Sequence, residues 1–391
     1  MDLKIFTENI EPEALNQLYT LAKLEAFKDT KIRIMPDVHA GAGCVIGFTA
    51  DLGDKVIPNI VGVDVGCGVY VRELGNIDLD LEKIDNYIKT VIPSGLNVNT
   101  RIQEDFDLTR LRCYNQLKNV PRLNLSLGSL GGGNHFIEID VDKNDNKYLV
   151  IHTGSRNLGL QVANIYQAKA IEYCHKGSLK EMQDKLIEEY KAQGRQAEIS
   201  DAIKKLHEDN PQYTIPNDLC FVEGKDREDY LHDMRICQEF AYRNRRVIAD
   251  RICRKFNLSV IGEFESVHNY IDDNNMVRKG AISAHKGEKL IIPLNMRDGS
   301  IIGIGKGNED WNESGPHGAG RLMSRSEAKR TLQIEDFQNA MNGIYTTTAN
   351  QDTIDESPMA YKSAKEILDN IKDTVEVIDV IKPIYNFKAS E

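Results

Sequence analysis

The chain has 391 residues and a formal net charge of −11, with 41% hydrophobic and 28% charged residues. This composition is typical of a globular protein and excludes a low-complexity or collagen-like chain. Every apolar stretch is shorter than the roughly 20 residues that cross a bilayer, and the first residues lack a signal peptide's apolar run, so we expect no membrane partner. The acidic balance argues against nonspecific nucleic-acid binding, because phosphates require local positive charge.

The cysteines indicate the redox compartment. There are seven of them, scattered along the chain, and none has the Cys-x-x-Cys spacing. An odd, scattered set argues against a disulfide framework and favours a reducing environment. We therefore expect a cytoplasmic protein.

The first 155 residues are predicted to alternate strands with glycine-rich turns. Short apolar runs predict strands at 31–34, 45–49 and 69–72. A helix is predicted over 78–89, because Leu81, Ile84 and Ile88 fall on one face. The run 148–152 is typical of a buried strand and ends on a histidine.

A helical block is predicted from about 158 to 257. In its second half Leu231, Met234, Cys237 and Ala241 recur at three- and four-residue spacing, which predicts one long amphipathic helix. The highly charged stretch 176–210 is predicted to form a pair of surface helices. Strands return at 259–262, 289–293 and 300–303. Because candidate site residues lie on both sides of the block, we interpret it as an insertion in one domain spanning 1–391.

A basic stretch lies within this block. Residues 242–255 carry six basic side chains and one acidic side chain, Asp250. We interpret the stretch as the solvated face of a helix, with an RNA-facing patch as the alternative.

Six segments place metal-ligand or nucleophile residues in or beside tight turns, most of them glycine-rich. They are 35–41, 62–68, 131–135, 152–156, 268–269 and 317–321. Glycine lets the backbone approach a ligand closely and tolerates positive φ. Any single segment could be structural, but the combination predicts a multi-metal active site gathered from the whole chain.

The candidate ligands are Asp64, Cys67, His135, His152 and His268. A Cys67 thiolate can bridge two cations, Asp64 offers a hard oxygen, and the histidines offer neutral nitrogens. Five donors shared by two metals leave coordination positions open, as catalysis requires. These donor types alone favour zinc.

The segment His317-Gly-Ala-Gly-Arg321 has a different character. A histidine followed by glycines is exposed on a close turn, and an arginine four residues later can hold a phosphate. Imidazole can attack phosphorus and form a phosphoramidate. The alternatives are a further metal ligand or a capping residue.

Taken together, the motifs resemble those of the RtcB RNA ligases, which join RNA 3′-phosphate or 2′,3′-cyclic phosphate ends to 5′-hydroxyl ends. The resemblance extends from about residue 35 to residue 388. Its motifs are Met-Pro-Asp-Val-His, Val-Asp-Val-Gly-Cys-Gly, Gly-Gly-Gly-Asn-His-Phe-Ile-Glu, His-Thr-Gly-Ser-Arg, Arg-Lys-Gly-Ala-Ile-Ser, Gly-Lys-Gly-Asn, His-Gly-Ala-Gly-Arg and Asp-Glu-Ser-Pro-Met-Ala-Tyr-Lys.

The resemblance implies one large α/β (α+β) domain, with mixed β-sheets around the metal site and a helical insertion. It also implies two Mn²⁺ per chain, GTP as energy source, and a covalent guanylate on His317. Asp64 and His135 would complete one metal site and His152 and His268 the other, with Cys67 shared. The implied partners are RNA with the ends named above and an archease-like activator.

The resemblance further implies a set of nucleotide-binding residues. In it Lys388 reaches the guanine base and Tyr361 stacks on it. The full set is Asn134, Glu138, His268, Asn269, Pro293, Met296, Ser300, His317, Gly318, Ala319, Gly320, Arg321, Tyr361 and Lys388.

The chain departs from the family pattern in two places. Leu294 and Arg297 stand where many members have glycines in the nucleotide loop, and Gly315-Pro316 precedes the nucleophile where Cys-Ser is usual. These changes bear on the preference for GTP over ATP and on the RNA substrate. Two other activities remain as alternatives: a metal-dependent phosphodiesterase acting on cyclic-phosphate RNA ends, and a protein that guanylates ends without sealing them. Asp37 and His39 receive no role from the sequence.

Overall fold

The computed structural model describes residues 1–175, 179–209 and 215–389, and it confirms a mixed α/β (α+β) fold. The helices are α1 (Pro12–Ala22), α2 (Pro58–Val61), α3 (Leu81–Val91), α4 (Val120–Ser126), α5 (Arg156–His175), α6 (Leu179–Ala192), α7 (Ile199–Asp209), α8 (Gly224–Phe256), α9 (Arg325–Thr331), α10 (Ile334–Ala340) and α11 (Ala364–Asn370). The strands are β1 (Asp2–Ile5), β2 (Lys31–His39), β3 (Ile46–Asp51), β4 (Gly68–Gly75), β5 (Phe136–Val141), β6 (Lys147–Thr153), β7 (Gly262–Val267), β8 (Tyr270–Ile271), β9 (Met276–Lys279), β10 (Ala281–Ser283), β11 (Lys289–Asn295), β12 (Gly299–Gly305), β13 (Ser314–Pro316) and β14 (Val375–Lys388).

The largest sheet has seven strands in the order β11-β12-β14-β5-β6-β4-β7. All of its pairs are antiparallel. Its two edge strands meet where the Ile291 backbone N–H of β11 donates to Ser266 Oγ of β7 at 2.9 Å. The sheet therefore curls back toward itself, which brings strands from distant parts of the chain around one interior.

A second sheet has five strands in the order β1-β2-β3-β9-β8. The β1–β2 pair is parallel and the other pairs are antiparallel. The short strands β10 and β13 form a separate antiparallel pair. In β13, Pro316 immediately precedes His317, so this small pair positions the candidate nucleophile.

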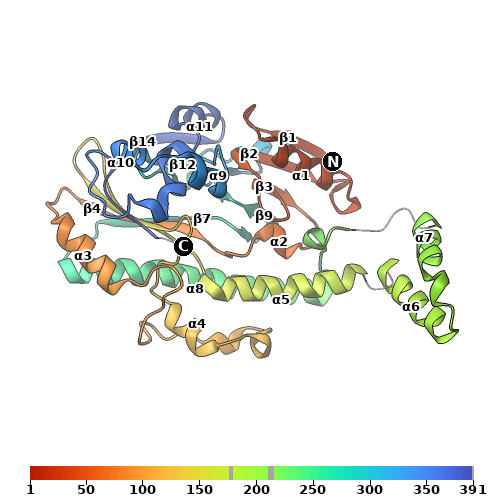
Figure 1. Cartoon of the computed structure of the whole chain (residues 1–391). Helices are drawn as coiled ribbons and strands as arrows, with labels where there is room; N and C mark the ends of the chain where they lie inside the picture. Colours follow the sequence, from red (N-terminus) through yellow and green to blue (C-terminus); the bar gives the residue numbers. More distant parts are fainter. Residues whose placement is uncertain (176–178, 210–214, 390–391) are drawn as a thin grey trace.

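The long helix α8 runs along the large sheet beside α5 (Figure 1). Its apolar side chains at Met234, Cys237, Ala241 and Ile248 are fully buried. Burial of this stripe stabilises the helix, since most helical stability in proteins comes from packing an amphipathic face. The long amphipathic helix predicted from the sequence is confirmed.

Most predicted elements lie within observed ones, but the strand predicted at 259–262 is wrong. Helix α8 ends at Phe256, and its C-cap residue Asn257 has a positive φ of 53°. Residues 258–261 then cross to the sheet, and β7 begins only at Gly262. The apolar pair Val260 and Ile261 resembled a strand, yet their side chains are exposed.

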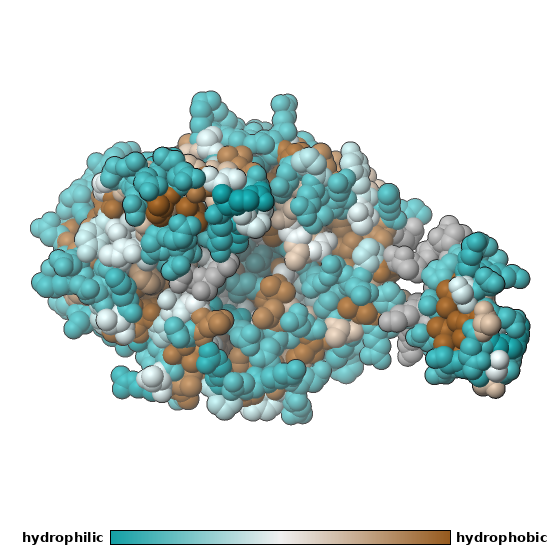
Figure 2. Space-filling model, in the orientation of Figure 1, coloured by the Kyte–Doolittle hydropathy of each residue, from teal (hydrophilic) through white to brown (hydrophobic). Residues whose placement is uncertain are grey.

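Helices α6 and α7 form a hairpin, the helical arm (residues 179–209), that projects from the body (Figure 1). No side chain of the arm is buried in the part of it whose burial is described. Figure 2 shows the arm standing apart, with some hydrophobic side chains on its surface. The predicted pair of charged surface helices is confirmed over 179–209, while 176–178 and 210 lie outside the described residues.

The basic stretch 242–255 is neither wholly solvated nor a free patch, so both interpretations need correction. Arg245 has a side chain that is only 1% exposed and pairs with Glu265 at 2.9 Å. Arg251 donates to the backbone carbonyls of Val91 and Gly128 at 2.8 and 3.2 Å. At least two of the six basic side chains, Arg245 and Arg251, therefore hold the helix against the body.

No helix among the described residues (1–175, 179–209 and 215–389) is long and apolar enough to cross a membrane. The one-domain organisation and the cytoplasmic location stay predictions.

Candidate metal and nucleotide site

The candidate metal ligands lie close together because four neighbouring strands of the large sheet begin or end at the same side of it. The turn holding Asp64 and Cys67 leads into β4, His135 immediately precedes β5, His152 lies near the end of β6, and His268 follows β7. These four strands are adjacent in the order β5-β6-β4-β7. The registers are consistent: Phe136 pairs with His152, and Gly68 pairs with Val267.

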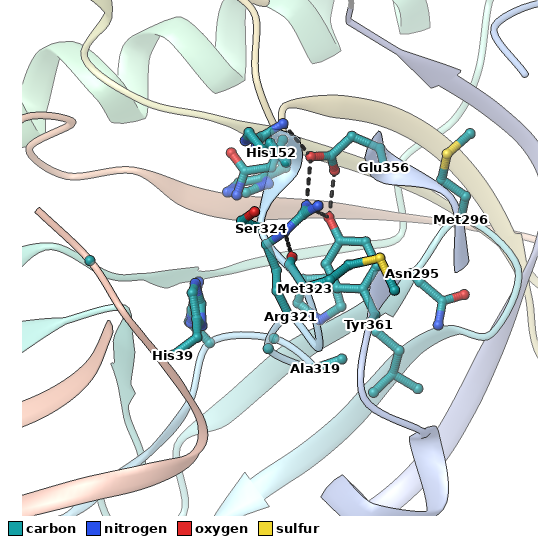
Figure 3. A pocket seen from close by; sticks show the side chains of 18 of the residues that line it. His39, His152, Asn295, Met296, Ala319, Arg321, Met323, Ser324, Glu356 and Tyr361 are labelled. Atoms are coloured by element: carbon teal, nitrogen blue, oxygen red, sulfur yellow. Dashed lines mark hydrogen bonds and ion pairs between the residues drawn. The ribbon is translucent and has the colours of Figure 1, made fainter. Parts of the chain in front are cut away.

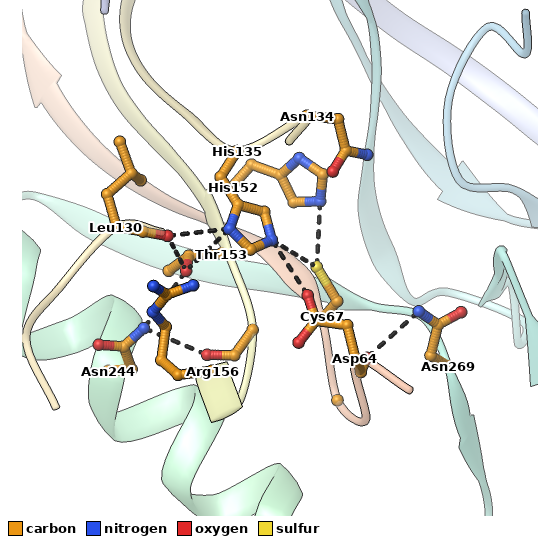
Figure 4. A network of polar contacts seen from close by, with 12 residues as sticks. Asp64, Cys67, Leu130, Asn134, His135, His152, Thr153, Arg156, Asn244 and Asn269 are labelled. Carbon is orange, nitrogen blue, oxygen red and sulfur yellow. Dashed lines mark hydrogen bonds and ion pairs between the residues drawn. The ribbon is translucent and has the colours of Figure 1, made fainter. Parts of the chain in front are cut away.

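The five side chains form two groups that share Cys67. One group is Asp64, Cys67 and His135, and the other is Cys67, His152 and His268, with the ligand atoms of each group within 4.8 Å of one another. Cys67 Sγ lies 3.5 Å from His135 Nε2 and 3.3 Å from His152 Nε2 (Figure 4). This grouping is the one that the family resemblance implies, and metal binding by these residues stays a prediction.

The surroundings of the histidines fit a cation. His135 Nδ1 donates a hydrogen bond to the Leu130 carbonyl at 2.9 Å, which fixes the tautomer of the ring. The lone pair of Nε2 is then available to a metal ion, and Nε2 lies 3.0 Å from Asp64 Oδ2. His268 Nδ1 is buried and has no hydrogen-bond partner among the described residues. Because buried polar atoms are almost always satisfied, this nitrogen fits a metal ligand.

Electrostatics at the group favour neutral histidines. Burial lowers the pKa of His152 and of His268 well below the usual value, so both imidazoles are neutral. Burial, followed by the neighbouring Asp64 carboxylate, raises the pKa of the Cys67 thiol. A bound cation reverses this balance, since a coordinating thiol is deprotonated outright.

A glycine allows two of these segments to approach closely. A Cβ at Gly154, just after β6, would lie 2.2 Å from Asp64 Oδ1. The His-Thr-Gly-Ser-Arg motif thus needs glycine at this position for the Asp64 turn to pack against it.

Beside the metal-ligand group lies a cavity of about 650 Å³ (Figure 3). His152 lines it, so the metal-ligand group reaches the cavity wall. The following residues of the predicted nucleotide set also line it: Asn134, Glu138, Pro293, Met296, His317, Gly318, Ala319, Gly320, Arg321, Tyr361 and Lys388.

The other three predicted nucleotide residues do not line this cavity. Ser300 is completely buried. The side-chain amide of Asn269 hydrogen-bonds to two backbone groups: it donates to the Asp64 carbonyl at 3.2 Å and accepts from the Gly280 N–H at 2.9 Å. His268 lies behind the cavity wall, with its ring 4.7 Å from that of His317. Nucleotide contacts from these three stay predictions.

Asp37 fixes the orientation of His317. Its Oδ2 accepts hydrogen bonds from His317 Nδ1 at 2.7 Å and from the His317 backbone N–H at 3.1 Å. With its proton on Nδ1, the imidazole keeps the Nε2 lone pair free. The sequence showed the motif containing Asp37 but gave it no role, because its partner lies 280 residues away.

The turn after His317 packs directly on β2. Gly320 has a φ of +76°, and a Cβ there would lie 2.3 Å from the Asp37 carbonyl oxygen. A larger residue would push the turn away from Asp37 and disturb the Asp37–His317 pair.

Glu356 is a second residue without a role from the sequence. Its side chain is 2% exposed and lies 2.7 Å from Lys388 Nζ and 3.2 Å from Arg321. It also accepts the Tyr361 hydroxyl hydrogen bond at 2.5 Å. Burial alone would raise the pKa of Glu356, but Lys388, Arg325 and Arg321 lower it to about 2. This carboxylate therefore stays ionised and positions the side chains predicted to contact the nucleotide.

Glu138 of β5 is a buried residue of the cavity wall. Its carboxyl accepts a hydrogen bond from Asn386 Nδ2, and burial raises its pKa to about 7. Asp140, two positions along β5, is also buried, and burial followed by Glu138 raises its pKa. One of these two carboxyl groups holds its proton near neutral pH.

The two departures in the nucleotide loop differ in position. Leu294 is buried and lines the cavity. Arg297 pairs with Asp298 at 2.9 Å and is not among the residues that line the cavity. Of these two residues, Leu294 is therefore the one whose side chain can affect nucleotide selectivity by contact.

Comparison with known proteins supports this architecture. The family model described as "tRNA-splicing ligase RtcB" matches residues 17–122 and 113–389. The chain is 30% identical to the RNA-splicing ligase RtcB of Escherichia coli strain K12, over 99% of this chain and 97% of the relative. It is 25% identical to the tRNA-splicing ligase RtcB of Aeropyrum pernix, over 91% and 87% of the two chains. The chain belongs to the RtcB family.

Although Leu294 departs from the RtcB family pattern, the chain keeps the family's metal-ligand motifs and the motif of the candidate nucleophile. All five candidate metal ligands and the His317–Arg321 turn are present, and His152 and this turn line the same cavity.

Proposed function

We propose that this protein is an RNA ligase that uses GTP and Mn²⁺ to join 3′-phosphate or 2′,3′-cyclic phosphate ends to 5′-hydroxyl ends. One observation carries the proposal. His317 lines the cavity with its Nδ1 held by Asp37, beside both the metal-ligand group and the predicted nucleotide residues. An imidazole held in this way is a nucleophile with its reacting nitrogen free.

In the proposed first step, His317 Nε2 attacks the α-phosphorus of GTP and pyrophosphate leaves. Asp37 stabilises the charge that develops on the imidazole, because its carboxylate accepts the Nδ1 proton's hydrogen bond. Asp64, Cys67, His135, His152 and His268 would hold Mn²⁺, which supplies charge neutralisation at the reacting phosphate. The guanylate then passes to the RNA 3′-phosphate, and the 5′-hydroxyl displaces GMP.

Glu138, Tyr361 and Lys388 are proposed to recognise the guanine base. A carboxylate suits the N–H donors of guanine and repels the acceptor N1 of adenine. Glu356 supports this recognition by holding Tyr361 and Lys388 in the cavity wall.

The test uses a labelled RNA strand, prepared once with a 3′-phosphate and once with a 2′,3′-cyclic phosphate, and a second strand with a 5′-hydroxyl. Each pair is incubated with GTP and Mn²⁺, or with Mn²⁺ alone, and resolved on a denaturing gel. The proposal expects a joined product that requires both GTP and Mn²⁺. Opening of a cyclic phosphate without any use of GTP would identify a phosphodiesterase. Accumulation of guanylated 3′ ends without joining would identify an end-capping protein.

A further inference from the structure

The wall of the cavity contains a histidine that the proposed steps above leave unused. His39 is the last residue of β2, and it lines the cavity with His317 and Arg321. His39 lies two residues after Asp37, the carboxylate that holds His317, and it stands close enough to His317 for the two imidazoles to interact electrostatically.

The hydrogen bonds of His39 determine its tautomer. Its Nδ1 lies 2.9 Å from the backbone carbonyl oxygen of Asp37, and a carbonyl can only accept, so the proton is on Nδ1. Nε2 carries the lone pair and makes no hydrogen bond to any residue in the described part of the chain. A neutral imidazole with a free nitrogen at a cavity wall is equipped to accept a proton.

The surrounding charges are consistent with this neutral state. Burial lowers the pKa of His39, and the nearby His317 and Arg321 act in the same direction. Asp37 raises it through the backbone hydrogen bond. From α1 and the residue before it, Glu13 and Glu11 line the same cavity, and Glu11 accepts a hydrogen bond from the Ala40 backbone N–H.

The position of His39 separates it from the nucleotide residues. In Figure 3 it stands at one side of the cavity, whereas Asn295, Met296, Tyr361 and Glu356 lie at the other. If the guanine base packs against Tyr361 and Met296, the part of the cavity beside His39 is open to the RNA strand that carries the 5′-hydroxyl.

We propose that His39 is the general base that removes the proton from the RNA 5′-hydroxyl during sealing. This inference rests on the proposed ligase function. The 5′-oxygen forms a bond to the phosphorus of the RNA 3′-phosphate, and the bond from that phosphorus to the GMP oxygen breaks. GMP leaves with the electron pair, the hydroxyl proton passes to His39 Nε2, and His39 then returns it to solvent. Attack by His317 on GTP releases no hydroxyl proton, so that step does not require His39.

The experiment separates these steps. Full-length wild type, His39→Ala and His39→Gln are each loaded with Mn²⁺ and given two assays in parallel. The first measures labelled GMP on the protein without RNA. The second measures single-turnover sealing of a chemically pre-guanylated RNA 3′ end to a 5′-hydroxyl strand between pH 5 and pH 9. His207→Ala, an exposed histidine of the helical arm, is the matched control.

Both His39 variants are expected to form the protein adduct at the wild-type rate and to seal about 10²–10⁴-fold more slowly, the usual contribution of a general base. Wild-type sealing should rise with pH to a plateau, and this rise should disappear in His39→Ala. Added imidazole should restore part of the His39→Ala rate, because it can enter the space and accept the proton.

Two results would overturn the inference and leave the ligase function standing. One is wild-type sealing by both variants, and the other is a parallel loss of adduct formation and sealing, which would make His39 a support for the nucleotide step. A wild-type protein that neither takes label nor seals would remove the proposed function and this inference together.

Discussion

The tautomer of His317 depends on a single buried carboxylate, and that dependence can be measured. Asp37→Asn keeps the shape of the side chain but offers an N–H in place of an acceptor, which favours a proton on His317 Nε2. We expect guanylation to fall by up to about 10⁴-fold, the loss seen when a catalytic histidine is held in the wrong tautomer. Labelled GTP measures the rate, and Asp310→Asn at the surface is the control. An unchanged rate would contradict the role given to Asp37.

The raised pKa of Glu138 predicts that the preference for GTP over ATP depends on pH. A carboxyl whose pKa burial raises to about 7 is protonated below that pH and ionised above it. Since the ionised form suits guanine, the preference for GTP over ATP in adduct formation should increase as pH rises through about 7. Glu138→Gln should remove this dependence. A preference that is constant with pH in the wild type would show that Glu138 does not read the base.

Both Asp37 and Glu356 were missed by sequence reasoning for the same physical reason. Each lies in a motif that the sequence analysis singled out, but the sequence does not show which distant residue an acidic side chain will contact. The Asp37–His317 pair spans 280 residues, and Lys388 reaches Glu356 from the end of β14. Tertiary structure alone brings these residues together.

Among the elements, the helical arm contributes none of its described residues (179–209) to the lining of the cavity. His175 Nε2 and Asn217 Oδ1, on either side of the arm, are 3.0 Å apart, so a short link can join its two ends. Replacing residues 176–214 with a brief glycine-serine linker should leave the melting temperature of the body nearly unchanged, because no side chain of the arm is buried where its burial is described. Guanylation should be retained. A large loss of thermal stability, measured by calorimetry, would show that the arm packs on the body.

The element predictions succeeded where a pattern was long and failed where it was short. The apolar stripe of α8 extends over many turns, so its period identified the helix. The apolar pair before β7 was too short to distinguish a strand from an exposed connection. The basic stretch of α8 was misread because charge in a sequence does not reveal burial, and Arg245 pairs with Glu265 inside the protein.

For the molecule as a whole, the candidate metal ligands join parts of the chain from Asp64 to His268 around one sheet edge. A metal that binds only the folded state raises its stability, and the gain increases with ligand concentration. Mn²⁺ should therefore raise the melting temperature of the wild type. Cys67→Ala should lower bound metal from about two ions per chain toward one or none and reduce this gain.

The control for this variant is Cys237→Ala, which removes another buried thiol that belongs to neither metal-ligand group. It should lose stability without losing metal. Unchanged metal content in Cys67→Ala, measured by elemental analysis, would show that Cys67 does not bridge two ions.

The most direct test of the account is transfer of label from GTP to His317. Wild-type protein is incubated with Mn²⁺ and GTP labelled at the α-phosphate, and the adduct is treated with acid and with alkali. A histidine phosphoramidate should be lost in acid and survive alkali. His317→Ala should take no label, yet it should still seal a pre-guanylated 3′ end, because that step bypasses the nucleophile. Labelling of His317→Ala, or a wild-type adduct stable in acid, would place the nucleophile elsewhere and contradict the mechanism.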